Sequence, residues 1–187
     1  METKIADEIL QHNEEFLKKA PKDLLKKADE LARKGQKPAY VLITCSDSRV
    51  DPEAIKKEFI GEEFEIRTAG HVLDKAGIES VQYAVEHLGV KHIVIMGHTK
   101  CGAVTEALNT DADLFILNKI REHIGNEKNL TEAIAKHSLE TAWDLAKLPF
   151  IRKNNVNIHV FLYDIKTMKV QHLLSLNASP VEIMSKS

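Results

Sequence analysis

The sequence predicts an α/β fold: a mostly parallel central β-sheet with an antiparallel edge strand, helices on both faces and an N-terminal helical arm. Stretches rich in β-branched residues alternate with stretches of helical periodicity, which is the pattern of βαβ units. The stretch at residues 91–96 is almost continuously apolar, as in strands buried on both faces. A short turn at residues 164–168 joins the last two strands, so the final strand is expected to run antiparallel.

Each element rests on a local pattern. Apolar stretches bounded by turn residues are expected to be strands at residues 39–44, 63–66, 91–96, 157–163 and 169–174. Apolar residues at spacings of three and four predict helices at residues 4–34 in two pieces, 52–59, 75–88, 101–108, 113–124 and 130–148. Pro21 interrupts the first helical stretch, Asp51 and Pro52 form a helix start, and Asn129 with Glu132 forms a cap.

A chain of 187 residues is long enough to bury one good core. We expect one α/β domain at residues 35–176, which binds the metal described below. The helical arm at residues 1–34 belongs to the same domain, and residues 177–187 form a loose tail. The arm is amphipathic, and the sequence leaves open whether it packs on its own core or embraces a partner subunit.

Composition excludes several classes of protein. Hydrophobic residues make up 43% and charged residues 29%, as in ordinary globular proteins, and the net charge of -2 argues against nucleic-acid binding. Two cysteines are too few for a disulfide framework. The first residues lack the apolar segment of a signal peptide, and no stretch approaches the roughly 20 apolar residues that span a bilayer. We therefore expect a cytoplasmic protein that binds neither nucleic acid nor membranes.

Three residues point to a metal site. Cys45 directly follows the predicted strand at residues 39–44, and His98 and Cys101 follow the strand at residues 91–96. Carboxyl ends of neighbouring parallel strands meet at one edge of a sheet, so these side chains are expected to converge. Two thiolates and an imidazole make a zinc site with a fourth position left over. Zinc with an open position is typical of catalytic sites, because it activates a bound water.

The alternative for these residues is two buried cysteines and a hydrogen-bonded histidine without metal. Both cysteines follow strand ends and have polar neighbours, which favours the metal site. Among the nine histidines, His71 is the second candidate, as a ligand or a proton relay. Most of the others, including His123 and His137, lack metal spacing and are expected on the surface or on helix faces.

Asp47 and Arg49 lie two and four residues beyond Cys45, so all three can share one side of an extended loop. Arg49 would keep the Asp47 carboxylate ionised and away from the metal, where it accepts a hydrogen bond from the bound water. If the pair opened, Asp47 would become a fourth ligand and close the site. The alternative is an exposed ion pair worth about 0–1 kcal/mol. Gly102 can present its N–H to a substrate oxygen, or simply provide room for a turn.

These residues resemble the β-class carbonic anhydrases. That family carries Cys-x-Asp-x-Arg, then Arg-Asn-Ala-Gly, then His-x-x-Cys-Gly. Here the first motif runs from Cys45 to Arg49, the second from Arg67 to Gly70, and the third from His98 to Gly102. The similarity covers most of residues 35–174 in the same order.

Three positions depart from the family pattern. Thr68 replaces an asparagine, His71 stands where asparagine or glycine is usual, and Leu162 stands where glycine is frequent. These changes leave the metal-binding residues in place, and they bear on the shape of the pocket and on substrate preference.

The resemblance implies one zinc ion per subunit, held by Cys45, His98 and Cys101, with Asp47 and Arg49 as the adjoining catalytic pair. It implies reversible hydration of carbon dioxide to bicarbonate and a proton through a zinc-bound hydroxide. It also implies a homodimer or homotetramer in which N-terminal helices wrap the neighbouring subunit.

Three alternatives remain. Some relatives in the family hydrolyse carbon disulfide or carbonyl sulfide instead. A zinc-stabilised scaffold without catalysis would have four permanent protein ligands. A nucleophilic Cys45 would need no zinc, but no glycine-rich phosphate loop encloses it.

Overall fold

The computed structural model describes residues 2–179 of the chain, which divides into two compact units, Met1–Gln36 and Lys37–Ser187. The first unit contains helices α1 (Glu2–Lys19) and α2 (Lys22–Lys34), which confirms two helical pieces interrupted at Pro21. Several large apolar side chains of these helices are exposed: Ile5, Ile9, Leu10, Phe16, Leu17 and Leu25. No helix in the described part of the chain is long and apolar enough to cross a membrane.

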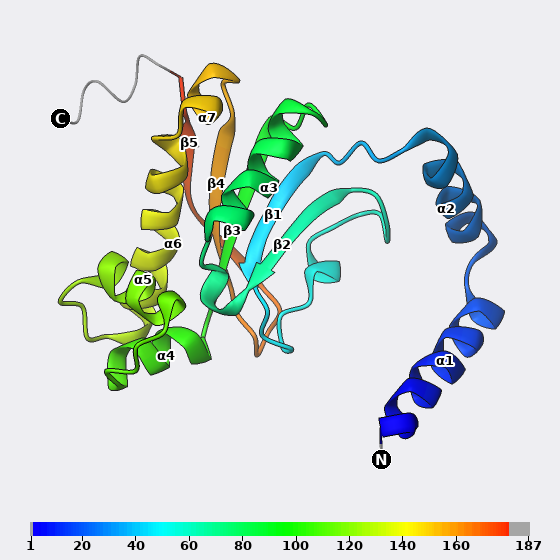
Figure 1. Ribbon diagram of the computed structural model, residues 1–187, viewed down its shortest axis with the longest axis horizontal. Helices are drawn as coiled ribbons and strands as arrows, with labels where there is room; N and C mark the ends of the chain where they lie inside the picture. The colour runs from blue at the N-terminus through cyan, green and yellow to red at the C-terminus, as the bar shows by residue number, and fades with distance from the viewer. Residues whose placement is uncertain (1, 180–187) are drawn as a thin grey trace. The chain divides into compact units, whose positions relative to one another are not determined.

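The second unit is built on one five-stranded sheet in the order β2-β1-β3-β4-β5 (Figure 1). The strands are β1 (Tyr40–Cys45), β2 (Glu63–Thr68), β3 (His92–His98), β4 (Asn157–Tyr163) and β5 (Val170–Asn177). The first four pair in parallel, and β5 runs antiparallel to β4 at the edge. The predicted sheet is therefore confirmed.

Helices cover one face of this sheet. The residues of α3 (Lys75–Glu86), α6 (Leu130–Ala146) and α7 (Pro149–Lys153) pack against the inward-facing side chains of β1 to β4 in the largest core cluster. On the opposite face, Leu42, Met96 and Tyr163 pack against Val50 and Ile55 of the loop that carries the short 3₁₀ helix η1 (Pro52–Ala54). Within this unit, α-helices therefore cover one face of the sheet and this loop contributes cover on the other.

The remaining helices lie beyond the carboxyl end of β3. Helix α4 (Gly102–Asn109) and helix α5 (Phe115–Ile124) pack with α6, and both contact the 3₁₀ turn η2 (Ala69–His71). Their apolar side chains form a second core cluster that includes Cys45 and Cys101. A hydrophobic cluster therefore surrounds the strand ends at which the metal site was expected.

Strand β3 and helix α6 approach each other closely at Gly97. A Cβ atom at this position would lie 2.3 Å from the Oγ of Ser138 and 3.4 Å from a methyl carbon of Ile134. The first distance is far below any van der Waals contact, so with the Ser138 hydroxyl in this position only glycine fits between β3 and α6.

Two predicted helices differ from the structure for local reasons. The helix expected at residues 52–59 is only η1, because the Glu62 carboxylate accepts the backbone N–H groups of Lys57 and Glu58 at 2.7 Å each. The helix expected to reach residue 148 ends at Ala146, because Pro149 lacks an N–H and favours an extended residue before it. The final strand extends to Asn177, and most of the predicted tail lies outside the described residues.

Candidate metal centre

Three side chains from two strand ends converge, as the sequence predicts. Cys45 is the last residue of β1, His98 is the last residue of β3, and Cys101 is the residue before α4. Their ligand atoms all lie within 4.8 Å of one another, and the three residues are at most 4% exposed. In the described residues they are the only group of this size that could hold a metal ion. The cluster offers two sulfur atoms and one nitrogen atom, which is a donor set that suits zinc.

The His98 ring is fixed in the tautomer that a metal requires. Its Nδ1 lies 3.0 Å from the carbonyl oxygen of Thr99, and a carbonyl only accepts hydrogen bonds. Nδ1 therefore carries the proton, and Nε2 presents a lone pair. Nε2 is buried and has no hydrogen-bond partner among the described residues. A metal ion is the kind of partner that satisfies such a buried lone pair.

The sulfur of Cys45 is surrounded by donors. The hydrogen bond from the Cys101 thiol is the largest influence, and the backbone N–H groups of Asp47 and Gly70 also donate, at 3.4 and 3.2 Å. Together they lower the pKa of Cys45 to about 4, although burial opposes the shift. The same contact with Cys45, helped by burial, raises the pKa of Cys101. One thiolate therefore forms easily, and a cation is needed to stabilise the second.

Asp47 and Arg49 form the predicted pair beside this cluster. The guanidinium donates to both carboxylate oxygens of Asp47, at 2.9 and 2.7 Å, and to the carbonyl of Lys100 at 3.2 Å. These bonds hold the pKa of Asp47 well below its usual range. The Asp47 carboxylate lies 3.9 Å from Nε2 of His98, so an ionised acceptor stands at the edge of the cluster.

Arg67 is a part of the site to which the sequence analysis gave no role. Its guanidinium donates to the carbonyl oxygens of Cys45 at 2.9 Å, Asp47 at 3.2 Å and Val50 at 2.9 Å. One cation thus fixes the loop that carries a cysteine of the cluster and the Asp47–Arg49 pair. The only feature of the sequence that could have indicated this role is the position of Arg67 at the carboxyl end of a strand. Its hydrogen-bond partners are backbone carbonyls, which leave no pattern in the sequence.

The turn η2 supplies a glycine to the site and places His71 outside it. Gly70 has φ 66°, and a Cβ there would meet Ile120 at 2.9 Å, so this position requires glycine. His71 is 1% exposed, and its ring packs at a tilt of 38° against the ring of His137, with centroids 4.4 Å apart. Its ring is not part of the Cys45, His98 and Cys101 group.

Gly102 is the first residue of α4 and directly follows the last cysteine of the cluster. A Cβ atom built there meets nothing within 4 Å, so space for a tight turn does not explain this glycine. Leu162, one of the departures from the family pattern, packs against the apolar cluster that contains both cysteines.

Two histidines expected on the surface or on helix faces are buried instead. His123 is 8% exposed and His137 is 0% exposed. Both point into the protein from the buried sides of α5 and α6. Helical periodicity correctly placed both residues on helices. The buried side of each helix includes polar residues next to its apolar ones, and the two histidines lie there.

Comparison with known proteins agrees with this geometry. The sequence model of the family described as carbonic anhydrase matches residues 40–170. Carbonic anhydrase 2 of Mycobacterium tuberculosis is 45% identical over 98 residues, which cover 51% of this chain and 47% of that protein. Carbonic anhydrase of Pseudomonas aeruginosa is 29% identical over 163 residues, which cover 74% of each protein. The matched part thus spans about half the length of the mycobacterial relative.

Solved structures share the fold. The β-carbonic anhydrase CafA of Aspergillus fumigatus superposes with a TM-score of 0.76 at 28% identity, covering 95% of this chain and 93% of that one. The β-carbonic anhydrase CcaA gives a TM-score of 0.77 at 22% identity, covering 93% and 95%, which shows likeness of fold alone. The family match spans most of the chain and includes the three converging residues. This chain belongs to the β-class carbonic anhydrase family.

Proposed function

We propose that this chain is a zinc-dependent carbonic anhydrase that hydrates carbon dioxide reversibly to bicarbonate and a proton. Cys45, His98 and Cys101 hold one zinc ion per subunit. The observation that carries the proposal is the buried Nε2 of His98. Its lone pair lies beside two cysteine sulfurs, and the atom has no hydrogen-bond partner among the described residues. Family membership supports the same activity.

The donor set fits zinc in kind and in number. Two sulfur atoms and one imidazole nitrogen leave one position of a tetrahedral ion for solvent or substrate. Zinc in such a site supplies Lewis acidity and lowers the pKa of a water molecule that it binds. A soft, sulfur-rich site also disfavours magnesium and calcium, which prefer oxygen ligands.

Asp47 and Arg49 prepare the open side of the site. Because Arg49 bonds both carboxylate oxygens, Asp47 stays ionised. Its carboxylate can therefore accept a hydrogen bond from a donor at the cluster. The same two bonds keep Asp47 from becoming a fourth ligand. Release of Asp47 from Arg49 would close the site, so this ion pair determines whether a substrate can reach the metal.

Removal of zinc is expected to abolish carbon dioxide hydration, and return of zinc is expected to restore it. The test combines metal analysis with stopped-flow hydration assays on the protein as purified, after chelation and after reconstitution. A fully active protein without metal would contradict the proposal. Zinc-loaded protein that turns over carbon disulfide or carbonyl sulfide but not carbon dioxide would favour a related hydrolase, and zinc without any turnover would favour a scaffold.

Gly102 is proposed to bind substrate through its backbone N–H, and two variants separate this role from a need for space. Gly102→Ala keeps the N–H and meets no atom within 4 Å, so kcat/KM should stay close to wild type. Gly102→Pro removes the N–H and should lower kcat/KM by roughly 10- to 100-fold.

Proline is a suitable variant because Gly102 opens the helix and Cys101 already has the extended conformation, φ -64° and ψ 120°, that proline requires before it. Thermal unfolding of both variants provides the control for folding. Equal kcat/KM values for the two variants would show that the N–H takes no part in substrate binding.

A homodimer or homotetramer is the assembly we propose. The exposed apolar side chains of α1 and α2, among them Ile5, Ile9 and Leu10, support this assembly, since such surfaces are usually covered by a partner.

A further inference from the structure

Behind the candidate metal centre lies a group of buried imidazoles that the catalytic proposal does not use. The His123 and His137 rings have centroids 4.9 Å apart, and the His71 and His137 rings have centroids 4.4 Å apart. All three side chains are at most 8% exposed. Buried imidazoles cost free energy unless their nitrogen atoms are hydrogen-bonded, so their partners indicate what they do.

Hydrogen bonds and the backbone of one residue, Gly70, connect two of these rings to the metal centre. The Asp144 carboxylate lies 3.1 Å from Nε2 of His123, and Nδ1 of His123 lies 2.9 Å from Nδ1 of His137. Nε2 of His137 then lies 2.8 Å from the carbonyl oxygen of Gly70. The N–H of Gly70 donates to the sulfur of Cys45 at 3.2 Å. We call Asp144, His123 and His137 the imidazole relay.

The two ends of the relay determine its number of protons. The Gly70 carbonyl and the ionised Asp144 carboxylate only accept, so Nε2 of His137 and Nε2 of His123 must both donate. The two Nδ1 atoms need a third proton between them. Two neutral imidazoles carry only two protons, so the His123–His137 pair carries one positive charge.

Two members of the relay have lowered pKa values. Burial is the main cause that lowers the pKa of His137 to about 4. The pKa of Asp144 is also lowered, because the bonds from Lys119, Lys147 and His123 outweigh its burial.

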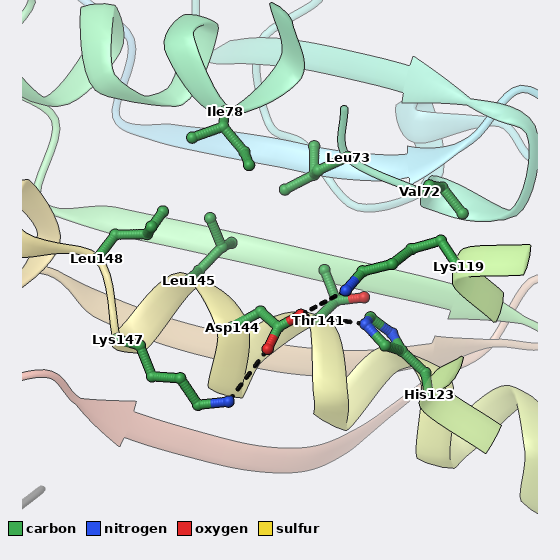
Figure 2. Close-up of a pocket in the computed structure, with 10 residues that line it drawn as sticks. All are labelled: Val72, Leu73, Ile78, Lys119, His123, Thr141, Asp144, Leu145, Lys147 and Leu148. Carbon is green, nitrogen blue, oxygen red and sulfur yellow. Dashed lines mark hydrogen bonds and ion pairs between the residues drawn. The ribbon is translucent and has the colours of Figure 1, made fainter. Parts of the chain in front are cut away.

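The outer end of the relay meets a pocket of about 340 Å³ (Figure 2). Its wall is apolar, with Val72, Leu73, Ile78, Leu145 and Leu148, and its polar side holds Asp144 between His123 and two lysines. Lys119 and Lys147 donate to Asp144 at 3.0 and 3.1 Å, and Lys119 also pairs with Glu122. Asp144 is 41% exposed, so the relay runs from a solvent-accessible carboxylate to a buried sulfur.

We propose that the imidazole relay positions the backbone of Gly70 against Cys45 and thereby raises the affinity of the site for its metal. Glycine has more backbone freedom than any other residue, and Gly70 stands in the left-handed region at φ 66°. The Gly70 carbonyl that His137 contacts and the Gly70 N–H that donates to the sulfur lie on either side of the Gly70 Cα. Bonds at both groups limit rotation about the two backbone bonds of Gly70 and so hold the N–H toward the sulfur. His123 and His137 are thus positioning residues. The inference rests on Cys45 being a metal ligand, as the proposed function requires.

The proton count is tested first, in metal-free protein, by nitrogen-15 NMR of the imidazole rings at pH 7. We expect three ring protons on the His123–His137 pair, with Nε2 protonated in both rings. Asp144→Asn removes the carboxylate that accepts from His123, so the pair should carry one proton fewer in this variant. Only two ring protons on the wild-type pair would overturn the relay. This result does not depend on zinc or on turnover, so it stands or falls separately from the proposed function.

The positioning role is tested by metal affinity and by spectroscopy of the cobalt-substituted protein. His137→Phe removes the donor to Gly70 and should weaken cobalt binding about 10- to 100-fold, with a shift of the thiolate-to-cobalt absorption band. His137→Gln can still donate to the Gly70 carbonyl and should restore most of the affinity. His159→Gln is the matched control, because it removes one ring of the His92–His159 pair, which lies on the sheet away from Gly70.

The outcomes separate positioning from packing. Wild-type cobalt affinity and an unchanged spectrum in His137→Phe would overturn the proposal. A loss of cobalt affinity in His137→Gln as large as that in His137→Phe would overturn it as well. If His137→Phe does not fold, the comparison of His137→Gln and Asp144→Asn with wild type still decides. Asp144→Asn should weaken cobalt binding, and His137→Gln should retain it.

Discussion

Replacement of Cys101 by serine is expected to remove zinc binding and carbon dioxide hydration together. A serine hydroxyl stays protonated near neutral pH and is a poor zinc ligand, so only Cys45 and His98 would remain to hold the ion. The fold should survive, because serine is close in shape to cysteine and Cys101 lies before α4, outside the strands. Zinc content, hydration rate and circular dichroism of the purified variant give the three measurements.

Both cysteines lie in the cluster, so no other cysteine can serve as a control. Variants of two histidines, one inside the cluster and one outside it, provide the comparison. His98→Gln should repeat the loss seen in Cys101→Ser. His172→Gln changes an exposed histidine of β5 and should leave zinc and activity unchanged. Stoichiometric zinc with full hydration in Cys101→Ser would show that Cys101 is not a ligand.

Replacement of Arg67 by methionine should destabilise the protein and empty the metal site. The guanidinium bonds three carbonyl oxygens, of Cys45, Asp47 and Val50, and methionine replaces none of these bonds. Hydrogen bonds to a charged group are worth more than neutral ones, so we expect the free energy of unfolding to fall by about 2–4 kcal/mol. The freed loop carries Cys45 and Asp47, so zinc affinity should fall as well.

Arg121→Met provides the comparison that separates the two effects. The Arg121 guanidinium also bonds three backbone carbonyls, those of Ala107, Thr110 and Ala112, at the end of α4 rather than at the cluster. Denaturant unfolding should show a similar loss of stability in both variants, whereas only Arg67→Met should lose zinc. Zinc loss of equal size in both would mean that Arg67 acts through overall stability and not on the loop.

Much of the fold could be predicted because it follows from short-range patterns. Strand β4 covers residues 157–163, as its apolar stretch predicts. The convergence of Cys45, His98 and Cys101 follows from parallel pairing of β1 with β3. The helix expected at residues 52–59 failed for a different reason. The Glu62 carboxylate competes for its backbone N–H groups, and local helical periodicity does not contain this contact.

The supporting residues of the site could not be predicted from sequence. Arg67 and His137 act on carbonyl oxygens of residues 22 and 67 positions away. A backbone carbonyl is present at every residue, so no choice of amino acid marks the partner. The ligands themselves were visible because sulfur and imidazole are rare and their order is distinctive, whereas the groups that orient them depend on the completed fold.

The contact between Gly97 and Ser138 has a consequence for the tolerance of this protein to mutation. The atom nearest to a Cβ at position 97 is the hydroxyl oxygen of Ser138, which lies in α6 next to His137. A larger residue at position 97 therefore becomes acceptable only after position 138 has lost its hydroxyl. In laboratory evolution the substitution in the helix would have to come before the substitution in the strand.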